Sequence, residues 1–440
     1  MPHRIVIVGG GAGGLVLATR LGKELGRNGK AAITLVDRSL THVWKPLLHE
    51  VASGSLDFSA NDVNYLAHAR WNHFQFQPGV LCGLDRGRRE IMLAEALDEG
   101  GDAIAPARRI AYDTLVLAIG SRSADFGVPG VREYCSFLDT AEEALRFHRK
   151  LLRRYLQAHA RAKDSDGPGM QGHDALDVVI VGGGATGVEL AAELRRASHQ
   201  LPHYGLESIQ PGRVRITVLD RAPRLLAALP ERVSRDAEAT LKSLDVQVMC
   251  GVAVSEVTDS AVHTKDGRRF PATFVVWAAG IEAPGVLDTL DGLETNSRHQ
   301  LKVKRSLQTT RDEAIFAMGD CAACPVEEGD ERTVPPLAQA AQQQARFLSE
   351  HLPRHLRGQA IPDFRFRNRG SLVSLADYSA VGNLMGNLMR DVSLEGRMAR
   401  YFYALLYRRH QLAVHGFART ALNVVLARIQ RRTEPRLKLH

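Results

Sequence analysis

The 440-residue chain is predicted to adopt an α/β fold with two Rossmann-like dinucleotide-binding domains, the second inserted into the first, and a C-terminal amphipathic region. Two observations support this prediction. A six-residue glycine-rich turn occurs at Gly9–Gly14 and again at Gly182–Gly187, 173 residues later. Each turn follows a short apolar run, opens a helical stretch and precedes a strand that ends in aspartate. Repetition of this whole unit is the organising feature of the chain.

The first repeat consists, in order, of strand, turn, helix and strand. Ile5–Val8 is an apolar run that leads into the glycines, and Leu15–Leu21 has the apolar spacing of a buried helix. Ala31–Asp37 is predicted to be the next parallel strand, and it ends in an acid. Further on, Tyr112–Ile119 is almost entirely apolar and stops at Gly120, which is typical of a strand buried on both faces.

The second repeat follows the same order. Asp177–Val181 and Val214–Asp220 are predicted strands, Val188–Arg196 is the helix between them, and Phe274–Ala278 is a later apolar strand. The acid of this repeat lies 33 residues after the last glycine, against 23 in the first repeat. An insertion rich in turn-forming residues at His199–Arg213 accounts for the difference.

The regions between and after the repeats differ in character. Thr140–His159 has helical spacing, whereas residues 160–176 are polar, contain Gly and Pro, and are expected to form a loop. After Pro335 the sequence becomes helical and Gln-rich, and after Phe364 it becomes basic and aromatic. The last change marks the start of the C-terminal region.

Each glycine of a turn has a physical task. The first permits the sharp turn, the second lets the backbone approach a pyrophosphate, and the third lets the helix pack close to the strand. The helix N-terminus attracts the negative charge. Asp37 and Asp220 are placed to accept hydrogen bonds from ribose hydroxyls. Because an acid repels a 2′-phosphate, the second turn favours NADH over NADPH, although the neighbouring Arg221 softens that preference.

Two dinucleotide turns in one chain indicate a redox relay. A nicotinamide gives up a hydride, and a flavin accepts it and releases electrons singly or in pairs. We therefore expect FAD at the N-terminal turn and NADH at the second, with the two rings face to face. A duplicated domain with one inactive site is the alternative.

The chain resembles the flavoproteins with two dinucleotide-binding domains. Beyond the turns, the resemblance rests on Ala314–Asp320, an apolar strand followed by Gly-Asp, in which Asp320 would bind the ribitol of FAD. It also matches Thr114–Gly120 to another strand of the FAD site and Val80 to the strand that meets the adenine. The FAD-binding residues that it implies are Gly9, Gly11, Ala12, Gly14, Asp37, Arg38, Lys45, Val80, Gly120, Asp320 and Ala338.

Within that superfamily the sequence is most similar to the type II NADH dehydrogenases, single-subunit NADH:quinone oxidoreductases of respiratory membranes. The similarity runs from end to end and includes a match to the motif A-Q-x-x-x-Q-Q. The matching segments are Trp44–Ala52, Gly187–Ala191, Trp277–Gly280 and Ala338–Gln344, with Gly370–Leu375 and Pro435–His440 similar to the proteobacterial branch.

This resemblance implies a domain organisation and a nicotinamide site. Residues 1–125 and 300–355 would form the FAD-binding domain, 126–299 the NAD(H)-binding domain, and 356–440 a membrane-association region. The NAD-binding residues would be Gly182, Gly184, Gly187, Asp220 and Gly280.

The resemblance also assigns candidate reactive residues. Gln339 and Gln343 lie four apart, share one helix face, and would offer amides to a quinone carbonyl; a solvated Gln-rich helix is the alternative. Glu189 would lie near the nicotinamide and the flavin, and in the family this glutamate is linked to NADH and quinone binding. A glutamate at a helix N-terminus is also a routine partner of the helix dipole, so a purely structural role stays open.

The charge of the chain is concentrated at its C-terminus. Residues 385–440 carry 11 Lys and Arg but 3 Asp and Glu, which accounts for the whole net charge of +8. Two apolar stripes in this region are flanked by Arg, which is the pattern of helices that lie on anionic lipid. The first stripe consists of Met398, Tyr401, Phe402 and Leu405, and the second of Leu422, Val425, Leu426 and Ile429. A helix packed on the protein's own core or on a second copy is the alternative. No segment has the ~20 apolar residues of a membrane span, and no nucleic-acid-binding module is recognisable.

The five cysteines indicate no disulfide framework. Cys321 and Cys324 form a lone C-x-x-C without a second pair for zinc, and we expect structural thiols. Disulfide reductases need a cysteine pair soon after the first acidic strand, and 41–52 contains none. A cysteine relay like that of sulfide:quinone oxidoreductases is not convincingly supplied either.

The sequence therefore predicts an enzyme that transfers a hydride from NADH to FAD and reduces a membrane quinone, expected to be ubiquinone, without proton pumping. We expect a peripheral protein on the cytoplasmic face of a bacterial inner membrane, with an anionic lipid surface as partner and a homodimer as an option. A redox sensor that binds FAD and NAD, or a soluble NADH-flavin reductase, is the alternative.

Overall fold

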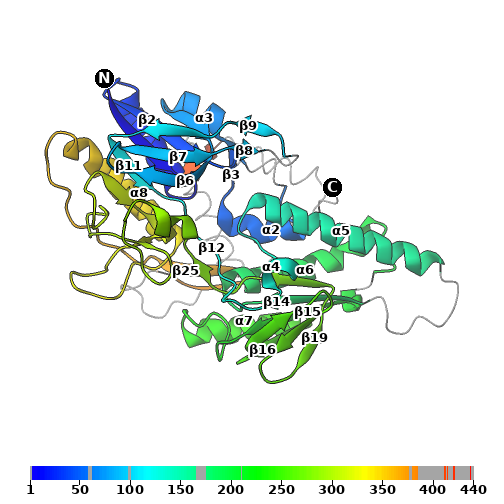
Figure 1. Ribbon diagram of the computed structural model, residues 1–440. Coiled ribbons are helices and arrows are strands. Elements are labelled where there is room, and N and C mark those ends of the chain that lie inside the picture. The colour runs from blue at the N-terminus through cyan, green and yellow to red at the C-terminus, as the bar shows by residue number, and fades with distance from the viewer. Residues whose placement is uncertain are drawn as a thin grey trace. The chain divides into compact units, whose positions relative to one another are not determined.

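The computed structural model describes residues 2–57, 62–97, 101–164, 175–209, 211–375 and 379–384, together with 411, 412, 414, 420, 421 and 437. The chain forms two compact units (Figure 1). Unit 1 comprises Met1–Trp44, Asn61–Arg122 and Ile281–Arg367. Unit 2 comprises Lys45–Ala60, Ser123–Gly280 and Asn368–His440. The central segment of unit 2 ends at Gly280, and the predicted domain ranges and their cofactor assignments stay predictions.

Unit 1 is built on a five-stranded parallel sheet with the glycine turn after its central strand. In spatial order the strands are β23 (Ile315–Ala317), β11 (Thr114–Leu117), β1 (His3–Val8), β2 (Ala31–Asp37) and β5 (Gln75–Pro78). Helix α1 (Gly14–Leu21) follows the turn and packs against α8 (Ala338–His355). An antiparallel sheet contains β10 (Arg108–Ala111), β7 (Glu90–Ala94) and β6 (Val80–Asp85).

Unit 2 repeats this architecture. Its parallel sheet contains β13 (Cys135–Ser136), β20 (Phe274–Trp277), β14 (Leu176–Val181), β15 (Val214–Asp220) and β16 (Val246–Cys250). Its antiparallel sheet contains β17 (Val254–Val257), β18 (Ala261–Thr264) and β19 (Arg269–Pro271). The principal helices are α2 (Leu48–Ser53), α5 (Ala141–Asp164), α6 (Ala185–Gln200) and α7 (Glu231–Ser243).

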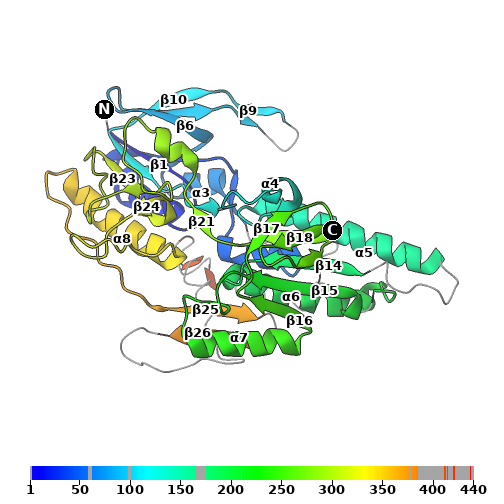
Figure 2. The ribbon, with the colours of Figure 1, turned by 60° about the horizontal axis from the view of Figure 1, so that its bottom comes forward.

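A hairpin from the C-terminal part of the chain completes unit 2. Strands β25 (Gly370–Leu375) and β26 (Ser379–Leu384) pair antiparallel along their whole length. Strand β25 contacts α6 and β26 contacts α7, as Figure 2 shows for the orange strands. The hairpin therefore brings residues late in the sequence onto the helix that follows the second glycine turn.

The remaining elements are short. In unit 1 they are η1 (Gly22–Gly26), β3 (Thr41–His42), β4 (Val63–Asn64), α3 (Tyr65–Trp71), β8 (Ala96–Leu97), β9 (Ala103–Ala105), β21 (Ile281–Glu282), η5 (Gly285–Thr289), β22 (Leu301–Lys302), η6 (Gly319–Cys321) and β24 (Ala322–Ala323). In unit 2 they are η2 (Lys45–Leu47), α4 (Val131–Tyr134), η3 (Leu201–Tyr204) and η4 (Pro211–Arg213), and β12 (Arg122–Ser123) begins at the boundary.

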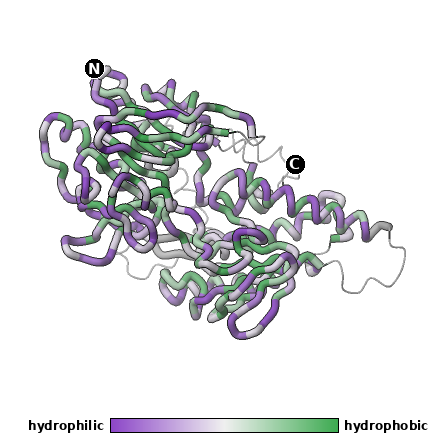
Figure 3. Tube along the Cα trace, in the orientation of Figure 1, coloured by the Kyte–Doolittle hydropathy of each residue, from purple (hydrophilic) through white to green (hydrophobic). Residues whose placement is uncertain are grey.

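The parallel strands form because they are apolar on both faces. Ile5, Ile7 and Leu35 are fully buried in unit 1, and Ile180 and Val218 are fully buried in unit 2. Figure 3 shows these strands coloured mainly as hydrophobic, whereas the long helix α5 is largely hydrophilic. Predicted strands 31–37 and 214–220 are confirmed at both ends.

Two expectations about the connections change. Helix α5 extends to Asp164, so residues 160–164 are helical where a loop was expected. Helical spacing alone did not reveal this, because the last turn of α5 is polar. The insertion at 199–213 contains two short 3-10 helices, η3 and η4.

The amphipathic stripes at 398–405 and 422–429 lie outside the described residues. Within the described part of the chain, no helix combines the length and the apolar character that crossing a membrane requires.

Candidate functional site

The first glycine turn has two crowded positions around an open one. Gly9 adopts a φ of +102°, and a Cβ there would overlap the carbonyl oxygen of Ala118. A Cβ on Gly14 would overlap the carbonyl oxygen of Gly9. Beside Gly11, by contrast, no described atom lies within 4 Å of a Cβ position. Only glycine fits the first and last positions, and the middle one leaves backbone open to a ligand.

The second turn reproduces this pattern. Gly182 has a φ of +119°, and a Cβ would run into the carbonyl of Ala278. A Cβ on Gly187 would overlap the carbonyl oxygen of Gly182. Gly184 again faces space that no described atom fills within 4 Å. The two turns therefore have the same local build, as their sequences predict.

The acids at the ends of β2 and β15 tie the turns to the sheets. One carboxylate oxygen of Asp37 accepts the N–H of Gly10 at 2.6 Å, and the other accepts the N–H of Ser39 at 2.9 Å. Asp220 accepts the N–H of Gly183 in the same way, and its other oxygen accepts that of Ala222 at 2.6 Å. A carboxylate oxygen has two lone pairs and can accept more than one hydrogen bond.

Tyr65 covers the first turn, a contact that was not predicted from the sequence. Its hydroxyl donates to the carbonyl of Gly10 at 2.8 Å, and its ring stacks on Phe76 with centroids 5.0 Å apart. In the second turn the apolar side chain of Leu225 approaches Gly183. An aromatic residue opening a helix 55 residues away carries no local signal of this contact.

A second group of unit 1 residues gathers where β11 and β23 end. These strands are parallel neighbours, so Gly120 and Gly319–Asp320 follow at the same edge of the sheet. Ser121 donates to Asp320 at 2.8 Å, and Gln300 donates to the Asp320 backbone carbonyl at 2.9 Å. Ser121 and Gln300 were not predicted.

The other candidate FAD residues are more scattered. Val80 is the first residue of β6 and 44% exposed, and Arg38 is exposed directly after β2. Ala12 lies in the turn, and Ala338 is the first residue of α8. Lys45 belongs to unit 2, where its ammonium group lies 3.1 Å from Asp139.

Three glutamines of α8 have different surroundings. Gln343 donates to the backbone carbonyl of Arg367 at 2.9 Å and accepts its N–H at 3.0 Å. Gln344, which sequence reasoning passed over, is buried and accepts the N–H of Gly319 at 2.7 Å. Gln339 is half-buried on the same helix. The missed signal is the spacing of Gln344, which lies four residues from both Ala340 and Leu348 and so shares their buried face of the helix.

Glu189 lies in the first turns of α6 and is 6% exposed. One of its oxygens accepts the N–H of Ser374 in β25 at 2.9 Å, and the other lies 3.5 Å from Nδ1 of His49. Burial raises the pKa of Glu189 well above its ordinary value, and Glu50 and Glu193 push it the same way. The carboxyl group is therefore held towards its protonated form.

His49 and Glu193 complete the buried polar group around Glu189. Burial lowers the pKa of His49 to about 3, so its ring is neutral at pH 7. Among the described residues Nε2 of His49 has no hydrogen-bond partner, and it lies 4.0 Å from Glu50. Glu193 accepts a hydrogen bond from Ser55 at 2.6 Å and pairs with Arg196 at 2.7 Å. Glu193 thus has a cationic partner within this group.

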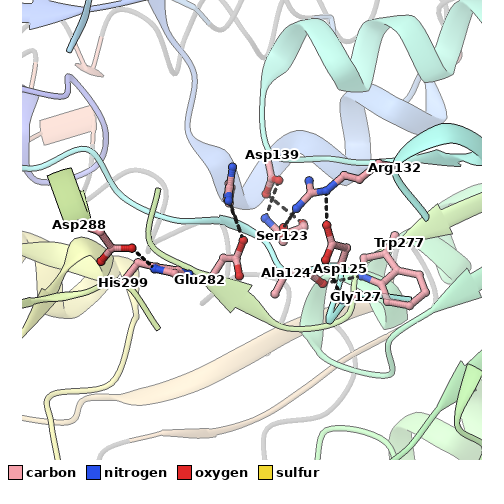
Figure 4. A network of polar contacts seen from close by, with 11 residues as sticks. Ser123, Ala124, Asp125, Gly127, Arg132, Asp139, Trp277, Glu282, Asp288 and His299 are labelled. Atoms are coloured by element: carbon pink, nitrogen blue, oxygen red, sulfur yellow. Dashed lines mark hydrogen bonds and ion pairs between the residues drawn. The ribbon is translucent and has the colours of Figure 1, made fainter. Parts of the chain in front are cut away.

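A tight turn that contains Ala124 and Gly127 lies beside Trp277, the last residue of β20 (Figure 4). Phe126 adopts a φ of 54°, and a Cβ on Gly280 would overlap its ring. Asp125 fixes the turn by accepting the N–H of Gly127 at 2.9 Å and pairing with Arg132. Trp277 donates to the carbonyl of Ala124 at 2.8 Å. The exposed Phe126 ring at this predicted NAD residue was not anticipated.

The cysteines behave as structural thiols. Cys321 and Cys324 are free and fully buried. Burial raises the pKa of Cys321 to about 11 and that of Cys324 to about 12. A thiol that stays protonated is a poor nucleophile, so neither is poised for thiolate chemistry.

Both turns fit a dinucleotide. Each offers the N-terminus of a helix, an open glycine that lets backbone approach phosphate, and an acid at the end of the next strand. The arrangement is that of an enzyme passing electrons between two such cofactors.

Comparison with known proteins places the chain in a class. Residues 3–345 match the family model described as pyridine nucleotide-disulphide oxidoreductase, and the chain belongs to that family. A type II NADH:quinone oxidoreductase of Haemophilus influenzae is 41% identical over 443 residues, covering 99% of both chains. The chain accordingly belongs to the type II NADH:quinone oxidoreductases, as its motifs predicted. A member from Staphylococcus aureus is 25% identical over 389 residues, covering 87% of this chain and 90% of the other.

Solved structures agree on the fold. NDH2 from Plasmodium falciparum in complex with NADH has a TM-score of 0.82 at 18% identity, covering all of both chains. The sulfide:quinone oxidoreductase of Aquifex aeolicus has a TM-score of 0.71 at 20% identity, covering 94% of this chain and 92% of the other.

Proposed function

We propose that this chain, an FAD-dependent NADH:quinone oxidoreductase, binds FAD at the turn of unit 1 and NADH at the turn of unit 2. The observation that carries the proposal is the duplicated turn with its crowded, open and crowded glycines and its tethering acid. Bound FAD supplies the chemistry of accepting a hydride equivalent from NADH and returning its electrons to a quinone.

The residues of unit 1 would hold FAD through contacts of different kinds. Gly9, Gly11 and Gly14 shape the loop around the pyrophosphate, and Asp37 is positioned for the ribose hydroxyls. Asp320, oriented by Ser121, is the acceptor for ribitol.

The second turn supports a preference for NADH. Asp220 presents a carboxylate where a 2′-phosphate would have to lie, and its tether to Gly183 and Ala222 fixes it there. Arg221 is exposed beside it and reduces the repulsion without removing it.

We propose Glu189 as the group that holds a proton for the reaction. Quinone becomes quinol by gaining two electrons and two protons, so a carboxyl kept protonated at neutral pH is useful there. Burial of Glu189 and its raised pKa support this role over that of an ordinary helix-terminal acid, which would be exposed and ionised.

For the quinone carbonyl we propose Gln339 and Gln343, which lie four apart on one helix. Both amide atoms of Gln343 are bonded to the backbone of Arg367, so that pair must open before Gln343 can bind a ligand. Quinones reside in lipid, and we propose ubiquinone as the substrate. We also propose a peripheral protein on the cytoplasmic face of a bacterial inner membrane, whose basic C-terminal region contacts anionic lipid. A homodimer is the proposed assembly. The two turns account for electron transfer alone, so the proposal includes no proton pumping.

Stopped-flow absorbance of the flavin tests the proposal. NADH should bleach the flavin, and a soluble ubiquinone analogue should then restore its colour within a turnover. A soluble NADH-flavin reductase would be bleached without recovery on quinone, and a redox sensor would turn over hardly at all. Flavin that stays oxidised with NADH contradicts the assignment.

A further inference from the structure

Three side chains of unit 2 form a line from the interior to the surface. The Glu189 side chain is 7% exposed, that of His49 is 2% exposed, and that of Glu50 is 23% exposed. Nδ1 of His49 lies 3.5 Å from Glu189, and Nε2 lies 4.0 Å from Glu50. The imidazole thus presents one nitrogen to a buried carboxyl and the other to a partly exposed one.

The reaction needs a path that brings a proton from solvent to the buried site. A hydride from NADH carries two electrons and one proton, whereas quinol formation takes up two protons, so one proton must come from solvent. Glu189 is too deeply buried to exchange directly with bulk water. A titratable side chain that reaches both the carboxyl and the surface would supply the path.

We propose that His49 relays protons between Glu50 and Glu189, a role that rests on the function proposed above for Glu189. Glu189 is protonated at rest and becomes ionised only when it has given up its proton; the imidazole is then neutral with its proton on Nδ1. A proton passes from the Glu50 carboxyl to Nε2, and the Nδ1 proton passes to Glu189. One O–H and one N–H bond break, one of each forms, and the imidazole ends neutral in its other tautomer.

The surroundings favour this use of the ring. A neutral imidazole has one donor and one acceptor nitrogen, and the low pKa of His49 keeps it neutral between the two carboxyl groups. The other charged groups nearby are Glu193 and Arg196, which are paired with each other, and Ser374 contributes an N–H. Arg196 disfavours an imidazolium and so supports the neutral ring.

The His49 ring makes a hydrogen bond with the backbone of Pro46, which accounts for one of its two nitrogens. The side chain is buried, yet within the described part of the chain its Nε2 makes no hydrogen bond. Burying an unsatisfied polar atom is unfavourable, and an apolar residue would avoid that penalty. Separations of 3.5 and 4.0 Å exceed a hydrogen bond, and catalytic contacts commonly tighten only in the working complex.

The test compares His49→Gln with His148→Gln in the full-length flavin-loaded protein. His148 is a buried histidine of α5 in the same unit, so its variant controls for loss of a buried imidazole. His49→Gln should lower kcat for quinone reduction at least 10-fold. Flavin bleaching by NADH and both KM values should change less than about 2-fold. Its kcat should also fall more steeply with rising pH than that of the wild type, because the proton must then come directly from solvent.

The variant Glu50→Gln should slow quinone reduction with the same pH dependence, because it interrupts the line at its outer end. The relay is refuted if His49→Gln and His148→Gln slow quinone reduction equally, or if flavin bleaching slows as much as reoxidation. Wild-type flavin that NADH bleaches and quinone fails to reoxidise would overturn the proposed function, and the relay with it. A wild type that turns over beside an unimpaired His49→Gln would overturn the relay alone.

Discussion

The two glycine turns have nearly the same backbone and differ in what the following helix buries. Both have left-handed first glycines, crowded third glycines and an aspartate tether. Two residues beyond the last glycine, however, α1 buries Val16 whereas α6 buries Glu189. Four residues further on, α1 has Arg20 and α6 has the buried Glu193. The two turns thus share one backbone, and the helices that follow them differ at positions that the turn leaves free.

The largest effects should come from the crowded third glycines. Gly14→Ala and Gly187→Ala each place a Cβ on a backbone carbonyl oxygen that cannot move without opening the turn. We expect a loss of at least about 3 kcal/mol in the turn concerned. Gly14→Ala should purify without flavin, and Gly187→Ala should keep its flavin but resist bleaching by NADH. Flavin absorbance before and after NADH measures both.

The variant Gly212→Ala is the matched control, because it has room for a methyl group among the described atoms and lies in η4, away from both turns. It should behave as wild type. The pairing of units with cofactors fails if Gly14→Ala retains flavin, or if Gly187→Ala loses it.

A pH series should separate the two helices. The folded pKa of Glu189 is raised above 4.5, so its protonated form contributes stability that is complete below that pH and is lost as pH rises through the folded pKa. Glu189→Gln keeps an oxygen that accepts the N–H of Ser374 and removes the charge. It should leave Tm unchanged at pH 4. At pH 8 it should raise Tm by at least about 2 °C, while quinone reduction falls. A stability gain that shrinks as pH rises would contradict this assignment; calorimetry measures it.

The open middle glycines should separate ligand binding from folding. A methyl group at Gly11 or Gly184 meets no described atom of the protein, so both alanine variants should keep Tm within about 2 °C of wild type. Gly11→Ala should weaken FAD binding about 10-fold and Gly184→Ala should weaken NADH binding similarly, a loss of about 1.4 kcal/mol each. Fluorescence titration of FAD and kinetic titration of NADH measure the two. Unchanged affinities would show that these glycines do not face phosphate.

The smallest effect concerns the residues that cover the turns. Tyr65→Phe removes a buried hydrogen bond to Gly10 and should cost about 1 kcal/mol of stability, mainly in unit 1. Leu225→Val in unit 2 removes one methylene and should cost a similar amount without affecting flavin retention. Flavin release on thermal unfolding distinguishes the two variants, because only Tyr65→Phe should release flavin earlier than the wild type. Equal loss of flavin in both variants would contradict this expectation.

Local patterns predicted the repeated units because their signals lie close together in sequence. The strand ends at Asp37 and Asp220, the turns and the burial of β11 all follow from short apolar runs with glycine after them. Ser121, Gln300 and Gln344 act through partners 20 to 199 residues away, and nothing near them in sequence signals those contacts. His49 is similar, since its neighbour Glu189 is distant in sequence and only folding reveals their proximity.

The edge strands of the two parallel sheets come from opposite ends of the insertion. In unit 2 the edge strand β13 precedes the rest of its sheet, so all five strands have been synthesised by Trp277. In unit 1 the corresponding strand β23 is translated about 40 residues later. At roughly 5–20 residues per second the ribosome releases it ~2–8 s afterwards. The nascent chain therefore completes the parallel sheet of unit 2 first, and the parallel sheet of unit 1 waits, with an unpaired β11 edge, for its last strand.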